Sequence, residues 1–127
     1  MRDFCIELAN AATGLADLGD LLGDAGVNIE GLSVTECDGR SIVHFVVTDA
    51  DAARRVLNGA GIRVLDDCDV FVLHKDRKQV TGKPGSFGAI CRTLSDHGIR
   101  VRFGYPAENN RFVFGVDNIK KARELLG

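Results

Sequence analysis

The stretch "LGDAGVNIEG" (residues 22–31) recurs in pattern as "LSDHGIRVRF" (residues 94–103), at an offset of 72 residues. In and upstream of both stretches, apolar residues fall at the spacing of one helical face, and these positions coincide at the same offset. The coinciding pairs are Leu15 with Phe87, Leu18 with Ile90 and Leu22 with Leu94. An amphipathic helix followed by a strand therefore occurs twice, which indicates an internal repeat.

Downstream of these stretches the offset becomes 69 residues, and the similarity continues through a strand and a second helix. The change of three residues falls at a hairpin, where Asp38-Gly39 and Asn109-Asn110 supply residues that tolerate positive φ. The alternating strand residues and apolar helix positions that coincide are Val43 with Phe112, Phe45 with Phe114, Val47 with Val116, Ala53 with Ala122, Val56 with Leu125 and Leu57 with Leu126.

Each repeat is predicted to run strand, helix, strand, hairpin, strand, helix, and the first repeat adds a final strand. This is the β-α-β-β-α-β order of a ferredoxin-like unit, an antiparallel sheet with both helices on one face. The sequence thus predicts an α+β fold of two such units, residues 1–69 and 70–127. The expected elements are 2–9, 14–25, 27–37, 40–48, 50–59 and 62–68 in the first unit, and 70–75, 85–97, 99–105, 111–116 and 118–126 in the second.

The second unit is expected to lack its last strand, because Asn58 aligns with Gly127, the last residue. Its sheet then has an exposed edge, where unpaired backbone groups invite another strand. Either the segment 62–79 covers this edge or a second copy of the chain does. We predict the second copy, and hence a homodimer.

The composition is that of a globular chain, since 45% of its 127 residues are apolar and 27% are charged. The N-terminal "MRDFCIELAN" lacks the basic and long apolar regions of a signal peptide, and no apolar run is long enough for a membrane span. We therefore expect a cytoplasmic protein without a membrane partner. Free thiols, with no metal site and no cofactor, are predicted because no C-x-x-C spacing occurs among Cys5, Cys37, Cys68 and Cys91.

Charge is distributed unevenly along the chain. Residues 1–69 carry 5 Lys and Arg against 13 Asp and Glu, net −8, whereas residues 70–127 carry 11 against 5, net +6. Such a division is typical of two halves that face each other, or of a basic half that meets an anion or nucleic acid.

Two corresponding stretches resemble the first helix and second strand of ACT domains. They are "KPGSFGAICRTLSDHGIRV" (residues 83–101) and "TGLADLGDLLGDAGVNIEG" (residues 13–31), and across both repeats the resemblance covers nearly the whole chain. It implies a free-standing tandem ACT protein. It further implies regulatory, non-catalytic binding of a small molecule, most often an amino acid, between two modules packed side by side.

The start of the second repeat's first helix is the candidate ligand site that the residues themselves support. A helix N-terminus presents unsatisfied backbone N–H groups and a partial positive charge, which suit a carboxylate. Pro84 fits a first helical turn because the N–H it lacks needs no intrahelical bond, and Gly85 lets a ligand approach the backbone. The alternative is that the stretch is only a well-formed helix start. The candidate residues are Gly82, Lys83, Pro84, Gly85, Ser86 and Phe87.

The corresponding stretch of the first repeat lacks the Pro-Gly pair. Asn10 keeps a polar side chain there, and Asn28 takes the polar position at the start of the second strand, where the second repeat has Arg100. An Asn amide both donates and accepts, whereas Arg only donates; Arg100 is otherwise a solvated strand residue. With the side-by-side packing that the resemblance implies, one site combines residues 82–87 with Asn28. The other combines Arg100 with Asn10, Ala11, Ala12, Thr13, Gly14 and Leu15.

Two other functions fit the sequence less well. Catalysis needs a nucleophile, base or metal in mutual reach, and His44, His74 and His97 are predicted in a strand, at a strand end and at a helix C-terminus. RNA binding of the RRM type needs sheet aromatics facing the bases, whereas Phe112 and Phe114 are predicted to face the helices. We therefore predict no enzyme and no nucleic-acid partner. A dimerisation or protein-interaction module without a ligand is the alternative to ligand binding.

Overall fold

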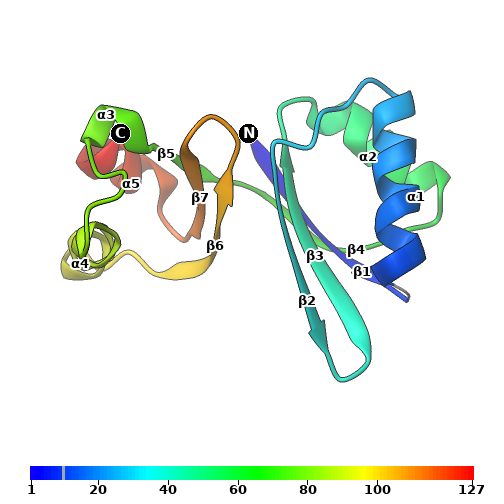
Figure 1. Ribbon diagram of the computed structural model, residues 1–127, viewed down its shortest axis with the longest axis horizontal. Coiled ribbons are helices and arrows are strands. Elements are labelled where there is room, and N and C mark those ends of the chain that lie inside the picture. Colours follow the sequence, from blue (N-terminus) through cyan, green and yellow to red (C-terminus); the bar gives the residue numbers. More distant parts are fainter. Residues whose placement is uncertain (10) are drawn as a thin grey trace. The chain divides into compact units, whose positions relative to one another are not determined.

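The computed structural model describes residues 1–9 and 11–127, with the side chains of residues 11–13 outside the description. The chain divides into two compact units, unit 1 over Met1–Cys68 and unit 2 over Asp69–Gly127, coloured blue to green and green to red in Figure 1. Each unit is described by itself below.

Unit 1 is a four-stranded sheet with two helices on one face (Figure 1). Its strand order is β4-β1-β3-β2, and β1 and β2 both pair antiparallel with β3. The order along the chain is therefore the predicted β-α-β-β-α-β. The elements are β1 (Arg2–Leu8), α1 (Ala11–Asp24), β2 (Gly31–Cys37), β3 (Arg40–Val47), α2 (Ala50–Gly59) and β4 (Arg63–Asp69).

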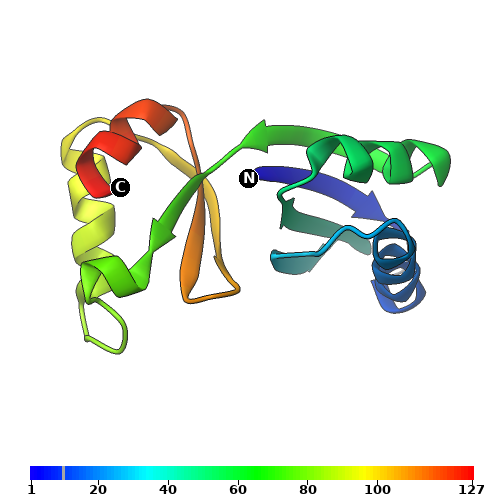
Figure 2. The ribbon, with the colours of Figure 1, turned by 90° about the horizontal axis from the view of Figure 1, so that it is seen from above.

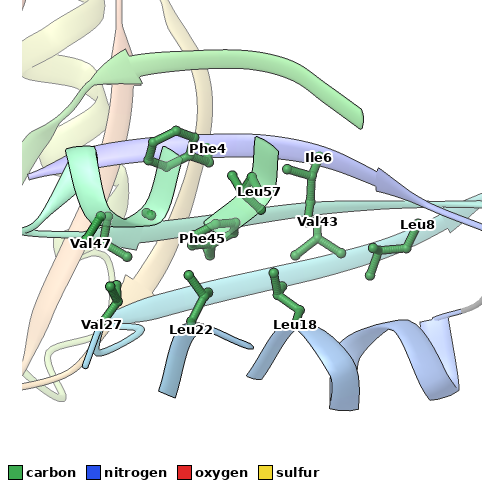
Figure 3. Close-up of a cluster of buried hydrophobic side chains, with 12 residues drawn as sticks. Phe4, Ile6, Leu8, Leu18, Leu22, Val27, Val43, Phe45, Val47 and Leu57 are labelled. Atoms are coloured by element: carbon green, nitrogen blue, oxygen red, sulfur yellow. The ribbon is translucent and has the colours of Figure 1, made fainter. Parts of the chain in front are cut away.

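The core of unit 1 lies between this sheet and its helices (Figure 3). Alternate residues of β1 and β3 point to the same side because strand side chains alternate with a period of two. Phe4 and Phe45 are directly opposite each other in register, with ring centroids 5.5 Å apart. Leu18 and Leu22 of α1 reach the same cluster from the helix side and are buried.

Unit 2 repeats the arrangement with three strands, in the order β6-β7-β5 (Figure 2). Its core gathers the buried residues of the helix-facing side, among them Phe71, Leu94 and Phe114. The predicted α+β fold of two ferredoxin-like units, the second lacking its last strand, is confirmed. The elements are β5 (Phe71–His74), α3 (Lys75–Lys78), α4 (Ser86–Asp96), β6 (Val101–Ala107), β7 (Arg111–Val116) and α5 (Ile119–Leu126).

The segment 62–79 does not fold back as a cover for the edge of unit 2. Its first part forms β4, which lies beside β1 in unit 1, and its later part forms β5 and α3. Among the described residues of unit 2, β5 is the last strand in the order. The segment 62–79 is thus not the cover of this edge. That a second copy of the chain covers it stays a prediction.

Several elements differ from the predicted ones. Helix α1 begins at Ala11 instead of residue 14, and the short helix α3 was not expected. Strand β2 begins at Gly31 instead of residue 27. The reason for the last difference is that the N–H of Val27 still donates to Leu22 O, at 2.9 Å, and so closes the helix.

Helices α1 and α4, which correspond in the repeat, end in the same way, with a glycine in the left-handed region. Gly26 has φ 73° and Gly98 has φ 71°. The N–H of the next residue returns to a carbonyl five residues back, Val27 to Leu22 and Ile99 to Leu94, each at 2.9 Å. This is the Schellman ending, which turns the chain from helix to strand.

Gly26→Ala should lower the free energy of unfolding by about 1 kcal/mol, because any residue with a Cβ is strained at positive φ. Gly19→Ala is the matched control within α1, since a Cβ there meets no described atom within 4 Å and no positive φ is involved. It should raise the free energy by up to about 1 kcal/mol through helix propensity. Urea titrations of both variants test the pair; equal effects would contradict the role of Gly26.

Charged side chains of unit 1 have defined partners. Arg2 Nε donates to Asp67 Oδ1 at 2.6 Å, and Arg54 lies 3.5 Å from the same carboxylate oxygen. His44 Nδ1 lies 2.9 Å from Oδ2 of Asp3, a carboxylate that is only 1% exposed. These carboxylates hold strands and a helix of the unit together.

Candidate functional site

A cavity of about 250 Å³ opens in unit 2 beside the start of α4. Its walls come from β5, the segment between α3 and α4, the first turns of α4 and the β6–β7 pair. Most of the lining is apolar, with a cation and two hydroxyl groups at the wall. The lining residues are Leu73, Lys75, Val80, Thr81, Gly82, Ser86, Phe87, Ile90, Pro106 and Phe112.

The segment before α4 is a tight series of turns around one carbonyl. Val80 O accepts from the N–H of Lys83 at 3.2 Å and from Ser86 Oγ at 3.0 Å. Gly82 and Gly85 have φ 72° and 84°, a region that favours glycine. The wall beside α4 is therefore held by backbone and hydroxyl contacts within the segment itself.

The β6–β7 hairpin fastens the other side of this segment. Asn110 Nδ2 donates to Thr81 Oγ1 at 2.8 Å and also to Asp76 Oδ1. Asn110 O accepts from the N–H of Lys75 at 3.1 Å. One hairpin residue in the left-handed region thus positions both ends of the cavity wall.

Two aromatic rings, those of Phe87 and Phe112, line the cavity. Phe112 lies 4.7 Å from Phe114 and 5.3 Å from Phe87, centroid to centroid. Phe87 falls on the predicted apolar helix face, yet 54% of it is exposed. The first turn of α4 lies over the cavity and not over the core, so this ring stays in contact with solvent.

Helix α4 begins at Ser86, and its N-cap is Gly85, with no side-chain hydrogen bond at the cap. The expectation that Pro84 lies in the first turn is wrong, because the positive φ of Gly85 is not helical and places Pro84 outside the helix. Among the six residues predicted in this stretch, Gly82, Ser86 and Phe87 line the cavity. Lys83, Pro84 and Gly85 are exposed and are not part of its lining.

The second predicted site is only partly described. Asn10 lies outside the described residues, and Ala11, Ala12 and Thr13 belong to α1 and not to a loop. Gly14 and Leu15 are also in α1, where Leu15 packs against the core. Arg100 is exposed just before β6, and its backbone N–H donates to Asp117 Oδ1 at 3.0 Å.

Asn28 is exposed between α1 and β2 of unit 1. Its pairing with the loop 82–87, and that of Arg100 with the loop of the first repeat, stay predictions. Sequence reasoning missed the other lining residues, which are Leu73, Lys75, Val80, Thr81, Ile90, Pro106 and Phe112, and it missed Asn110, which holds the wall. The repeat held a usable signal for Lys75, since it stands where the first unit has an apolar residue.

Burial shifts the pKa values of two groups of unit 2, His74 and Cys91, in the direction that favours their neutral forms. Burial lowers the pKa of His74 below its ordinary value of 6.5, and the positive charges of Arg77 and Arg111 act in the same direction, against a smaller opposite effect of Asp76. Burial raises the pKa of the Cys91 thiol above 9.0. A protonated thiol is a poor nucleophile.

His97 is the C-cap of α4, and its Nδ1 lies 2.8 Å from Thr93 O, so its predicted position at a helix C-terminus is confirmed. Within the described part of the chain, no group of three or more His, Cys, Asp or Glu side chains is arranged to hold a metal ion. No described helix has the length and apolar character needed to cross a membrane.

Comparison with known proteins identifies the fold. No protein-family model matches the chain, and no curated protein matches it. Protein BT0572 from Bacteroides thetaiotaomicron is a similar solved structure, with TM-score 0.77 and 23% identity over 98% of this chain and 84% of that one.

Two further similar structures come from aspartate kinases. Aspartokinase alpha and beta subunits match with TM-score 0.70 and 15% identity, over 98% of this chain and 88% of that one. The regulatory subunit of aspartate kinase from Thermus thermophilus, in its ligand-free form, matches with TM-score 0.65 and 14% identity, over 98% and 85%. The chain therefore has an ACT-like α+β fold, which it shares with an aspartate kinase regulatory subunit.

Proposed function

We propose that this chain is a non-catalytic regulatory module that binds a small molecule, an amino acid, in the cavity of unit 2. The observation that carries the proposal is the cavity itself, which lies at the stretch the sequence marks as a ligand site and includes Gly82, Ser86 and Phe87. The fold shared with an aspartate kinase regulatory subunit supports the regulatory role.

The start of α4 gives the cavity a suitable polar end. Because Gly85 caps the helix without a side chain, the first-turn N–H groups have no side-chain acceptor from the cap. Backbone N–H groups at a helix start favour a carboxylate, and all amino acids carry one. Regulation then acts through an oligomer or a partner that responds to the bound state.

At least one amino acid should bind the wild-type chain at millimolar concentration, measured by isothermal titration calorimetry across the twenty amino acids. Thr81→Trp should abolish the heat, because the indole fills the cavity from its wall. Ser95→Trp, at an exposed position of α4 outside the lining, should leave it intact. Absence of heat with every amino acid would favour the alternative, a dimerisation or interaction module without a ligand.

We also propose that the chain forms a homodimer through the edge of unit 2. Strand β5 ends the strand order there, whereas its counterpart β1 has β4 on its outer side. A second copy can hydrogen-bond to that edge and add apolar burial to a small unit. Light scattering at micromolar concentration should give twice the chain mass of 13.7 kDa. A mass equal to that of one chain would exclude the dimer.

A further inference from the structure

Lys75 of unit 2 occupies the position that Leu8 has in unit 1. The strand registers establish the equivalence, because β3 and β7 correspond at the offset of 69 residues and their partners β1 and β5 then correspond at 67. Lys75 and Leu8 each lie four residues after the phenylalanine of the matching pair; Lys75 is the residue directly after the β5–β7 register, and its N–H donates to Asn110 O at 3.1 Å. The pairs that fix the equivalence are Phe4 with Phe45 and Phe71 with Phe114.

Leu8 fills its place in the core of unit 1. It is 7% exposed, packs in the cluster with Leu18 and Val43 (Figure 3), and lies close to Gly14, where an added Cβ would be 3.3 Å from it. In unit 2 the counterpart of Gly14 is Ser86, and both Ser86 and Lys75 line the cavity. The cavity thus stands where an apolar side chain completes the core of the other unit.

The walls of the cavity suit an apolar group. Leu73 and Ile90 are buried, Val80 is half-buried, and the ring of Phe112 lies across from them. Of the two wall hydroxyls, Thr81 Oγ1 accepts from Asn110 and Ser86 Oγ donates to Val80 O. The rest of the lining between them is apolar, so a polar side chain would exchange most of its water contacts for apolar ones, at a cost in free energy.

Lys75 supplies the single cation of the lining. Within the described part of the chain it has no ion-pair partner within 4.0 Å, and the neighbouring Asp76 carboxylate is engaged by Asn110. A lysine stem packs along apolar walls while its ammonium stays at the polar rim. The lining therefore combines one cationic side chain with mostly apolar ones.

We infer that the cavity selects a small carboxylate with an apolar side chain, whose carboxylate pairs with the ammonium of Lys75 and whose side chain packs against the apolar lining beside the lysine stem. This inference rests on the proposed function, because an apolar amino acid is one source of that chemistry. An acid of the same shape without the ammonium group is the other source. Lys75 is the specificity-determining residue for the carboxylate.

Calorimetry with four probes tests the inference on the full chain. Leucine and 4-methyl-2-oxopentanoate share the apolar carboxylate and differ in the ammonium group, leucinamide lacks the carboxylate, and aspartate has a polar side chain. Leucine should bind at least tenfold more tightly than leucinamide or aspartate. Lys75→Met should weaken leucine at least tenfold and leave leucinamide unchanged, and Lys120→Met on α5 should match the wild type.

The outcomes separate this inference from the proposed function. Binding of 4-methyl-2-oxopentanoate without leucine supports the inference and overturns the amino acid in the proposed function. Tighter binding of aspartate than of leucine overturns the inference and leaves the proposed function standing. Leucine binding that Lys75→Met does not change, in a variant with wild-type circular dichroism, overturns the role of Lys75. Absence of binding by all four probes overturns the inference.

Discussion

Phe114→Ala should lower the free energy of unfolding by about 3–5 kcal/mol, the usual loss for a buried phenylalanine. Phe114 is 1% exposed and stacks on Phe71 at 6.1 Å between ring centroids, with Phe112 at 4.7 Å. Its removal leaves a cavity at the centre of unit 2 that the surrounding rings cannot close. Denaturant titration and faster amide exchange in β5 and β7 measure the loss.

Phe87→Ala is the matched control, since Phe87 contacts the same rings but is 54% exposed. Truncating an exposed ring removes little buried surface, so the loss should stay below about 1 kcal/mol. Equal losses for the two variants would contradict the placement of Phe114 at the centre of the core.

Leu18→Ala should lower the free energy of unfolding by about 2–5 kcal/mol through the same combination of lost transfer energy and residual cavity. Leu18 is 1% exposed and joins α1 to the sheet of unit 1, where it meets Val43 and Phe45 (Figure 3). Thermal or denaturant unfolding followed by circular dichroism gives the measurement.

Leu21→Ala tests the same helix three residues on, at a leucine that is 38% exposed. Both changes have the same effect on helix propensity, so the difference between them reports burial alone. We expect Leu21→Ala to cost less than half as much as Leu18→Ala. The reverse order would mean that α1 presents another face to the sheet.

Three of the six residues of the predicted ligand loop line the cavity, and the other three do not. Gly82, Ser86 and Phe87 were found because glycine and a helix start are local signals. Pro84 was included because it suits a first helical turn, but the turn around Val80 O and the positive φ of Gly85 leave Lys83 and Pro84 exposed before the helix. Local sequence cannot show that exposure, because it depends on which carbonyl the turn encloses.

The residues of the cavity wall that the sequence did not predict contact one another although they are far apart in the sequence. Asn110 reaches Thr81 across 29 residues and Asp76 across 34. The sequence indicated Asn110 only as a hairpin residue, which it is, with φ 55°. Its second role follows from the β5–β7 pairing, which places the hairpin beside the segment after β5.

The sequence by itself determined the repeat, the order of the elements apart from the short helix α3, and the ends of several of them. Period and offset suffice for this, because helix and strand faces are set by local spacing, and helix ends by residues within one turn. The corresponding caps are an example. Gly26 and Gly98 follow the ends of α1 and α4 in the left-handed region. At the starts of α2 and α5, the side chains of Asp49 and Asn118 each accept a hydrogen bond from a backbone N–H of the first turn, at 3.0 Å.

Only the tertiary structure decided that Lys75 lines a cavity of unit 2 while its counterpart Leu8 packs in the core of unit 1. Lys75 follows directly after the β5–β7 register and begins α3, and the cavity that it lines also takes residues from β5, from the segment between α3 and α4, from α4 and from the β6–β7 pair. Whether a space is filled depends on side chains that converge from several elements. Such convergence is a property of packing in three dimensions, which spacing along the chain does not encode.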